Sequence, residues 1–386
     1  MITTFNSQST EFRKKRILLG HLASFGDCLY ATTIAKQIKT DYPNCHLTWA
    51  IGSKYRSILN ENPHVDEIWE IPLNSRDDIA QAWYKFKKVA LERYEQGDFD
   101  EIFLTQIYPD NYKTYDGTLR SSILRFYGKP ITVGVNPVIV LSEQEVNNVY
   151  NFVYKNNLLE KKNIILFECS AKSDQSFVTT EFALELVKIL IDKIPDCRII
   201  LSSDIPISIL DERIIDGSSL SFRENAELTK YCSLLIGCSS GISWLCTSEW
   251  AKKLPSIQLL KADKSMYASF IYDHQYHGLT YDHIIEMTDT TAETVAACVI
   301  AVIKDGVATA RLNFHQDITL DFTFYFQTMA FVLYKRKFKD FIFSLFYTFK
   351  RYGFRPNLLK SFLPLIQYIM TLGYQKFLKK LKFSTR

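Results

Sequence analysis

The sequence has 386 residues, which is too long for one ordinary hydrophobic core, so we expect two domains and an appendage. Apolar residues make up 47% and charged residues 23%, a composition that excludes disordered and fibrous proteins. The net charge of +4 is unevenly spread, because residues 322–386 contain 13 Lys/Arg and a single acid, Asp340. This tail carries +12 and the remainder −8, an asymmetry that indicates an anionic surface as the partner of the tail.

The first half of the chain alternates short apolar strands with helices. After polar residues 1–15, we predict strands over 16–22, 46–51, 65–71 and 101–105, and helices over 28–40, 54–60 and 78–95. Such alternation indicates βαβ units and a parallel sheet. The rhythm weakens after residue 128, and a predicted helix over 142–157 ends in a Lys/Asn-rich link.

A second alternating series begins at residue 163. We predict strands over 163–169, 197–202, 234–238, 256–260 and 283–287, and helices over 179–194, 224–231, 242–252 and 291–304. Neither half contains a GxGxxG, and the pattern favours an α/β protein of two Rossmann-like halves with a ligand cleft between them. The predicted domains are 1–158, 159–310 and, as a helical tail, 311–386.

The cysteines and the N-terminus predict a compartment. Eight cysteines are scattered without a CxxC or a metal-ligand spacing, mostly inside apolar runs. The polar N-terminus lacks a signal-peptide pattern, so we expect a reducing cytoplasm. No stretch reaches the roughly 18 uninterrupted apolar residues of a spanning helix.

The first candidate site is the loop Leu22-Ala-Ser-Phe-Gly-Asp-Cys28, between a strand and a helix. Gly26 permits a tight turn, and Asp27 would lie at the helix N-terminus, at the carboxyl edge of the sheet. A carboxylate there could take a proton from an acceptor hydroxyl. Alternatively Asp27 only caps its helix, which the spacing by itself favours, and tight capping would lower its pKa.

The second candidate site is Leu234-Leu-Ile-Gly-Cys-Ser-Ser-Gly-Ile-Ser-Trp244, again strand, small-residue turn and helix. Ser239, Ser240 and Gly241 could present N–H groups and hydroxyls to an anion such as a pyrophosphate leaving group. An ordinary serine-capped helix has the same pattern.

Two further segments are weaker candidates. In the loop Glu168-Cys-Ser-Ala-Lys-Ser-Asp174, Ser170 and Lys172 could contact a donor phosphate, although a solvated lysine is the simpler interpretation. His274, His277 and His283 lie in a Tyr-rich segment, which we interpret as a loop wall of a polar pocket rather than a metal site.

These segments, together with Tyr42-Pro-Asn-Cys-His-Leu-Thr-Trp-Ala-Ile-Gly-Ser-Lys-Tyr55 and Asn62-Pro-His-Val-Asp-Glu-Ile-Trp69, resemble glycosyltransferase family 9. This family comprises the heptosyltransferase-like enzymes of bacterial surface polysaccharide synthesis. The resemblance is densest over residues 16–27, covers most of residues 15–305 and is loose over 75–160.

The resemblance implies a GT-B fold, with an acceptor-facing N-terminal domain and a nucleotide-facing C-terminal domain. It implies an inverting transferase that uses a nucleotide-sugar as substrate and needs no metal or cofactor. Asp27 falls on the catalytic-base position, with Ser24 and Gly26 in the acceptor-side loop. Ser240 and Gly241 fall on the pair that meets the donor phosphates.

Departures from the family leave the identity of the donor open. Family members usually have Asp or Asn before the Ser/Thr-Gly pair and His three residues after the glycine, where this chain has Ser239 and Trp244. The loop after Phe167 lacks the usual Gly and Trp-Pro. An ADP-heptose donor is therefore not implied.

The tail contains 19 Phe/Tyr among its 65 residues from 322 to 386, in apolar blocks that alternate with basic clusters. Amphipathic helices in an anionic membrane interface have this composition, and Pro356 and Pro364 would divide the tail into about three helices. We predict peripheral attachment to the inner face of the membrane. The alternatives are packing on the N-terminal domain, oligomerisation, or nucleic-acid binding, for which no motif is present.

The predicted partners are therefore a nucleotide-sugar donor, a lipid-linked or polysaccharide acceptor and an anionic membrane, without nucleic acid. A non-catalytic nucleotide-sugar-binding or scaffolding protein is the main alternative, and a GT-B sugar-nucleotide epimerase is a second.

Overall fold

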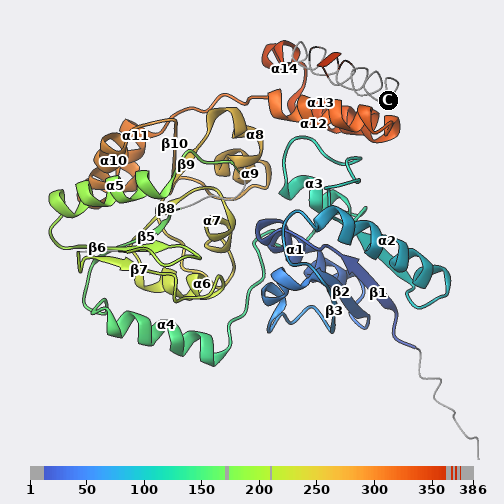
Figure 1. Cartoon of the computed structure of the whole chain (residues 1–386), viewed down its shortest axis with the longest axis horizontal. Helices are drawn as coiled ribbons and strands as arrows, with labels where there is room; N and C mark the ends of the chain where they lie inside the picture. The colour runs from blue at the N-terminus through green and yellow to red at the C-terminus, as the bar shows by residue number, and fades with distance from the viewer. Residues whose placement is uncertain are drawn as a thin grey trace, which may run out of the picture.

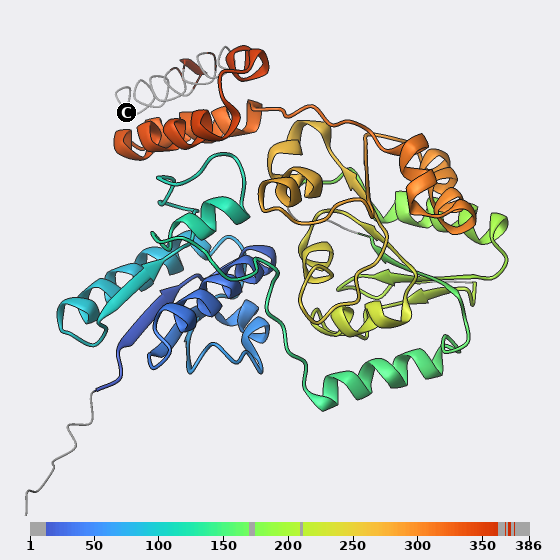
Figure 2. The ribbon, with the colours of Figure 1, turned by 180° about the vertical axis from the view of Figure 1, so that it is seen from behind.

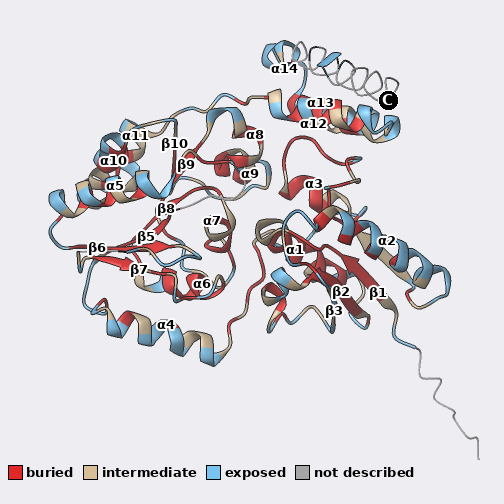
Figure 3. Cartoon of the chain, in the orientation of Figure 1, coloured by how far each residue is buried: buried red, intermediate tan, exposed pale blue. Residues whose placement is uncertain are grey.

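The chain folds into two lobes, each built on a parallel sheet, in a computed structural model (Figure 1). The structure describes residues 13–169, 174–208 and 211–361, with residues 367, 370, 371 and 374 beyond them. The central strands of both sheets are deeply buried (Figure 3).

The N-terminal sheet has four strands in the order β3-β2-β1-β4. They are β1 (Arg16–Gly20), β2 (His46–Gly52), β3 (Glu67–Ile71) and β4 (Glu101–Leu104). The helices of this lobe are α1 (Phe25–Asp41), the 3-10 helix η1 (Ser53–Leu59), α2 (Ile79–Glu95) and α3 (Arg120–Arg125). β1 reads as a continuous apolar run because both faces of a parallel strand are covered, and Ile17, Leu18 and Leu19 are fully buried.

The C-terminal sheet has six strands in the order β10-β9-β8-β5-β6-β7. They are β5 (Asn163–Glu168), β6 (Cys197–Ser202), β7 (Ile214–Asp216), β8 (Leu234–Gly237), β9 (Ser256–Leu260) and β10 (Ile284–Thr288). Its helices are α4 (Glu143–Lys155), α5 (Thr180–Lys193), α6 (Glu224–Leu228), η2 (Thr229–Tyr231), α7 (Gly241–Leu245), η3 (Ala262–Lys264), α8 (Ser265–Ala268), α9 (Phe270–Tyr276), α10 (Ala292–Asp305) and α11 (Val307–Phe314).

Both strand orders are those of doubly wound nucleotide-binding sheets. All pairings are parallel, and the order reverses between β1 and β4 in one sheet and between β5 and β8 in the other. Ligands of such sheets bind outside the carboxyl ends of the strands at these switch points. The two motif loops follow β1 and β8, so the topology places both candidate sites at a switch point. The predicted fold class, two Rossmann-like domains, is confirmed.

Helix α4 lies within the range predicted for the N-terminal domain, yet it packs on the C-terminal sheet. Val149 and Val153 share a buried cluster with Ile164, Leu166 and Ile200 of β5 and β6. The connection that leads to α4 runs down between the lobes (Figure 2).

Two helix predictions are wrong. The helix predicted over 242–252 ends at Leu245, because later backbone N–H groups bond to distant partners: Glu249 N–H donates to Pro137 O, and Lys252 N–H to Thr229 Oγ1. The segment predicted as a loop around His274 contains helix α9, which Ser269 caps by accepting a hydrogen bond from Tyr272 N–H.

The tail crosses back from the C-terminal lobe and packs on the N-terminal lobe (Figures 1 and 2). It forms α12 (Thr323–Tyr334), α13 (Phe338–Tyr352) and α14 (Pro356–Lys360), and Pro356 begins α14 as predicted. Phe322, Tyr325 and Met329 are part of the N-terminal core cluster. The alternative of packing on the N-terminal domain is thus confirmed for α12. Pro364 lies outside the described residues, among which no helix is long and apolar enough to cross a bilayer.

The buried side chain of Arg223 connects the two lobes. Its guanidinium donates to Glu145 Oε1 at 2.7 Å and Oε2 at 2.9 Å, and to the carbonyls of Val140 at 2.6 Å, Ser57 at 3.1 Å and Asn60 at 2.7 Å. These partners lie on η1, on the connection between the lobes and on α4, so one cation anchors all three.

We predict that Arg223→Ala lowers the free energy of unfolding by about 3–5 kcal/mol, because it leaves the Glu145 carboxylate and three carbonyls without their donor. Urea unfolding followed by tryptophan fluorescence measures it. Lys88→Ala is the control, since the Lys88–Glu92 pair is exposed on α2 and its loss should cost under about 0.5 kcal/mol. Equal losses in the two variants would contradict the anchoring role of Arg223.

Candidate active site

The loop after β1 is held by a glutamine from the loop after β4. Gln106 Oε1 accepts from Leu22 N–H at 2.7 Å and from Ala23 N–H at 3.2 Å. Ser24 is the N-cap residue of α1, and Asp27 lies in the first helical turn. The loop is therefore held on one side by Gln106 and on the other by the start of α1, and this positions Asp27.

The carboxyl group of Asp27 has a pKa raised to about 6. Loss of hydration raises it, and hydrogen bonds from Ser24 and the charge of Arg76 oppose the shift without cancelling it. The interpretation of Asp27 as a helix cap is correct in one respect, because its carboxyl group accepts hydrogen bonds from Ser24, the N-cap residue of α1. Capping does not lower the pKa below its usual range, as it would for a well-hydrated cap, so Asp27 keeps the properties of a base.

The loop after β8 faces the loop after β1 directly. A Cβ on Gly26 would lie 4.0 Å from Trp244 Cδ1, and one on Gly241 would lie 3.4 Å from Phe25 Cβ. The Phe25 ring stacks on Phe222 with centroids 4.5 Å apart. The two motifs, separated by more than 200 residues, thus meet at the contact between the lobes.

The predicted donor residues differ in how the protein uses them. Ser239 is buried, its hydroxyl donates to Ala268 O and its N–H donates to Gln258 Oε1. Ser240 is the half-buried N-cap of α7, and Gly241 is its first residue. Ser170 and Lys172 lie outside the described residues, and their roles stay predictions.

A carboxylate from β5 occupies the N-terminus of α7. Glu168 accepts hydrogen bonds from Cys238 N–H at 2.9 Å, Ile242 N–H at 3.0 Å and Ser243 Oγ at 2.5 Å. Burial raises its pKa despite these bonds. α7 is five residues long, so its dipole is small. The negative charge of the Glu168 carboxyl group already interacts favourably with the positive end of this dipole. Glu168 begins one of the candidate loops of the sequence analysis, but no local sequence pattern predicts that its carboxyl group lies at the N-terminus of α7.

Trp244 contacts side chains from both lobes. It stacks on Phe270 at 3.8 Å and meets Tyr30 edge-on at 5.1 Å. Arg120 from α3 lies against both rings, 4.8 Å from the Trp244 centroid and 5.1 Å from that of Tyr30. Its Nη1 is 3.3 Å from Asp273 Oδ2, and its nitrogens make no hydrogen bond to other described residues.

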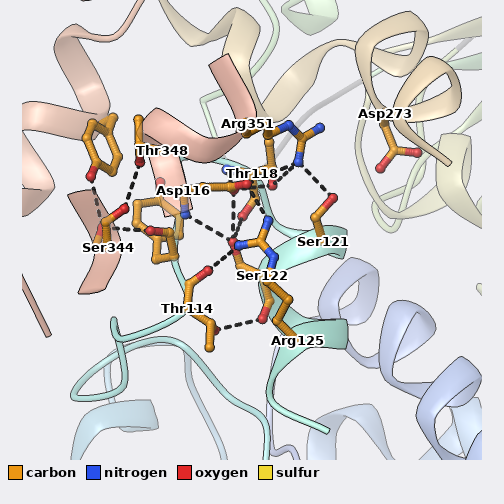
Figure 4. Close-up of polar contacts among 12 residues, drawn as sticks. Thr114, Asp116, Thr118, Ser121, Ser122, Arg125, Asp273, Ser344, Thr348 and Arg351 are labelled. Carbon is orange, nitrogen blue, oxygen red and sulfur yellow. Dashed lines mark hydrogen bonds and ion pairs between the residues drawn. The ribbon is translucent and has the colours of Figure 1, made fainter. Parts of the chain in front are cut away.

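Beside Arg120, a polar cluster joins the N-terminal lobe to the tail (Figure 4). The buried Asp116 carboxylate accepts from Thr118 N–H at 3.0 Å and from Arg351 Nη1 of α13 at 3.2 Å, and it also pairs with Arg125. Burial raises the pKa of Asp116, but the two guanidiniums outweigh it and the pKa is lowered. Arg351 also donates to Ser121 Oγ at 2.8 Å.

The histidines of α9 take part in this contact as neutral side chains. His277 Nε2 lies 3.2 Å from Ser121 Oγ, and His274 Nδ1 lies 2.7 Å from Phe270 O. Burial, reinforced by Arg120, lowers the pKa of His274 to about 4 and that of His277 to about 3. Within the described residues, no three His, Cys, Asp or Glu side chains form a group that could hold a metal ion.

A separate open hollow of about 1060 Å³ lies between α4, β6 and β7. Its lining is polar and includes Asn148, Lys161 and Asp216, but none of the predicted site residues. Because it lies away from both switch points, we assign the site to the contact between the motif loops rather than to this hollow.

Comparison with known proteins was made on sequence and on structure. No family profile matches the sequence. The chain is 21% identical to lipopolysaccharide heptosyltransferase 1 of Campylobacter coli, over 66% of this chain and 86% of the relative. It is similar in structure to the glycosyl transferase family 9 protein of Veillonella parvula, with a TM-score of 0.50 and 13% identity over 76% of this chain and 93% of that one.

A second structure, the ADP-heptose LPS heptosyltransferase II of E. coli, matches with a TM-score of 0.50 and 14% identity over 75% of this chain and 99% of that one. The fold is that of glycosyltransferase family 9. The predicted resemblance to this family and the two-domain GT-B fold are confirmed. The predicted class of enzyme, a glycosyltransferase, is the class of the Campylobacter coli relative and of both similar structures.

We predict that Asp27→Asn raises stability at pH 8. Because the folded-state pKa is raised to about 6, the folded protein holds a proton between about pH 4 and 6 that the unfolded chain releases, so stability falls as pH rises through this window. The asparagine removes that penalty and gains about 1–2 kcal/mol at pH 8, measured by urea unfolding.

Asp66→Asn is the control of opposite sign. Burial raises the Asp66 pKa, but hydrogen bonds from Leu47 N–H and Lys39 outweigh it and lower the pKa, so this variant should lose stability at pH 8. A loss of stability in Asp27→Asn at pH 8 would contradict the raised pKa of Asp27.

Proposed function

We propose that the protein is an inverting glycosyltransferase that moves a sugar from a nucleotide-sugar donor to a lipid-linked or surface-polysaccharide acceptor. The observation that supports it best is the meeting of the loops after β1 and β8. It brings the segment that carries Asp27, whose pKa is raised to about 6, against the first turn of α7. The distant similarity to lipopolysaccharide heptosyltransferase 1 agrees with this chemistry.

In the proposed reaction, Asp27 accepts the proton of an acceptor hydroxyl as its oxygen attacks the anomeric carbon. The bond from that carbon to the donor's phosphate oxygen breaks, its electron pair leaves with the nucleoside diphosphate, and the configuration at the carbon inverts. A base with a pKa near 6 is ionised at neutral pH and retains affinity for the proton.

The leaving diphosphate would contact the N–H groups of Ser240 and Gly241 and the Ser240 hydroxyl. Both residues are half-buried, and Glu168 already accepts hydrogen bonds from the Ser240 side chain and from the N–H of Ile242. The predicted contacts of Ser170 and Lys172 would add to this set. The Phe25–Phe222 stack lies across the same place, so the lobes must part there to admit the donor.

The donor is a nucleotide-linked hexose or heptose in this proposal, and it is a substrate rather than a bound cofactor. We propose that no metal takes part, so EDTA leaves turnover unchanged. The acceptor lies at the inner face of a membrane, to which the basic tail attaches from the cytoplasm. The +12 charge over residues 322–386 supports this placement.

One observation favours a second candidate, a non-catalytic nucleotide-sugar-binding or scaffolding protein. Glu168 already occupies the N-terminus of α7, and its negative charge there would oppose a diphosphate. In this alternative Asp27 has no role in turnover.

We predict that Asp27→Asn lowers kcat by about 10²–10⁴-fold and leaves nucleoside diphosphate binding unchanged, because the substitution removes the base and keeps its shape. For the wild type, log(kcat/KM) should rise with unit slope up to about pH 6 and then level off. Turnover of a nucleotide-sugar panel, preceded by a thermal-shift screen, measures both.

Asp66→Asn is again the control, because Asp66 is remote from the motif loops and should leave kcat unchanged. Donor binding without turnover in the wild type would favour the scaffolding alternative. No thermal shift with any nucleoside diphosphate would contradict both.

A further inference from the structure

Helix α13 packs on the N-terminal lobe with both apolar and polar side chains. Ser344 and Thr348 are fully buried, and Ser344 Oγ donates to Tyr115 O at 2.6 Å. Arg351 points inward to Asp116 and Ser121 (Figure 4). The inner face of α13 therefore contacts the N-terminal lobe through hydrogen bonds and one ion pair, in addition to apolar side chains such as Leu345 and Tyr352.

A second set of large apolar side chains on α13 points outward. Phe338, Ile342 and Phe346, spaced four residues apart on one line of the helix, are 61%, 64% and 59% exposed. Phe343 is also exposed, as is Phe354, which follows the helix and stacks on Phe349. We call these five exposed residues the α13 outer face. Exposed aromatic clusters of this kind mark interaction surfaces in water-soluble folds.

Basic side chains surround the α13 outer face. Exposed lysines and arginines on α13 and its neighbouring turns are Lys335, Arg336, Lys339, Lys350, Arg355 and Lys360. Lys113 of the N-terminal lobe lies 4.8 Å above the Phe343 ring. Asp340, the one acid in the tail, is turned inward toward Tyr112 N–H. The surface is therefore aromatic at its centre and cationic at its rim.

We propose that the α13 outer face is the membrane-contact surface of the protein and lies in the headgroup layer of an anionic phospholipid bilayer. Aromatic and branched apolar side chains enter the interface while the surrounding lysines and arginines meet lipid phosphates. The charge complementarity favours lipid over a protein partner, since the rim offers no acid for a mixed-charge interface. This inference deepens the proposed function, on which it rests for a membrane-bound acceptor.

The same helix connects this surface to the site. Arg351 on its inner side contacts Ser121 of α3 and lies 3.8 Å from the Tyr276 ring of α9, so α13 touches both lobes. A bilayer bound to the outer face therefore has a fixed orientation relative to the contact between the motif loops.

Flotation of the full chain with vesicles tests the proposal. The wild type should bind vesicles of phosphatidylcholine with about 30% phosphatidylglycerol and bind pure phosphatidylcholine weakly. Ile342→Ser with Phe346→Ser should weaken binding about tenfold or more, since two apolar side chains leave the interface. Lys339→Glu with Lys350→Glu should weaken it by at least about 25-fold, at about fivefold per lost basic residue.

The matched control is Tyr150→Ser with Tyr154→Ser, which removes two exposed aromatics from α4 and should leave binding unchanged. All these positions are exposed, so thermal midpoints should stay close to that of the wild type. Equal vesicle binding by wild type and Ile342→Ser/Phe346→Ser would overturn the proposal. So would a wild-type dimer that this variant dissociates without any vesicle binding.

The two proposals fail separately. Loss of vesicle binding should leave nucleoside diphosphate thermal shifts unchanged, because the outer face is remote from the motif loops. Turnover of a water-soluble acceptor without any vesicle binding would refute the membrane surface and leave the glycosyltransferase standing. Vesicle binding without turnover or nucleotide binding would do the reverse.

Discussion

The buried guanidinium of Arg223 fixes how the C-terminal lobe sits on the rest of the chain. A buried cation is stable only when its N–H donors have hydrogen-bond acceptors. Here the acceptors are both oxygens of one carboxylate and several backbone carbonyls. Its partners belong to η1, to the connection between the lobes and to Glu145 of α4. The anchor supports the approach of the two motif loops, which meet among the described residues through ring packing and van der Waals contact.

On the other side of the contact, Arg120 is buried in a different way. It lies between Tyr30 and Trp244 with Asp273 3.3 Å away, and π faces replace the acceptors that Arg223 has. Cation–π contacts orient a guanidinium less strictly than bidentate hydrogen bonds. The contact between the lobes is thus tightly bonded at the connection and held by ring packing near the motif loops, where the donor must enter.

Local pattern determined most of the fold, and tertiary partners determined the exceptions. Each strand of the predicted alternation formed, because a run such as Ile17–Leu19 has both faces covered in a parallel sheet. The length of α7 and the position of Glu168 were not predictable, since they depend on acceptors and donors that are remote in sequence. The roles of Asp27 and of the donor residues follow from the resemblance, and the structure adds the electrostatics of Asp27 and the carboxyl group beside Ser240.

The tail shows how two interpretations of one composition can both apply. Its charge and aromatic content indicate an anionic surface, while the buried Tyr325 and Met329 of α12 show packing on the N-terminal lobe. Binding to an anionic surface and packing on the N-terminal lobe exclude each other only if they require the same side chains. In α13 they do not, because the inner contact uses side chains such as Ser344, Arg351 and Tyr352, whereas Phe338, Ile342 and Phe346 are exposed. Hydrophobic periodicity by itself does not predict the polar part of the inner contact, since it takes no account of the carbonyl of Tyr115 and the carboxylate of Asp116 that the inner face meets.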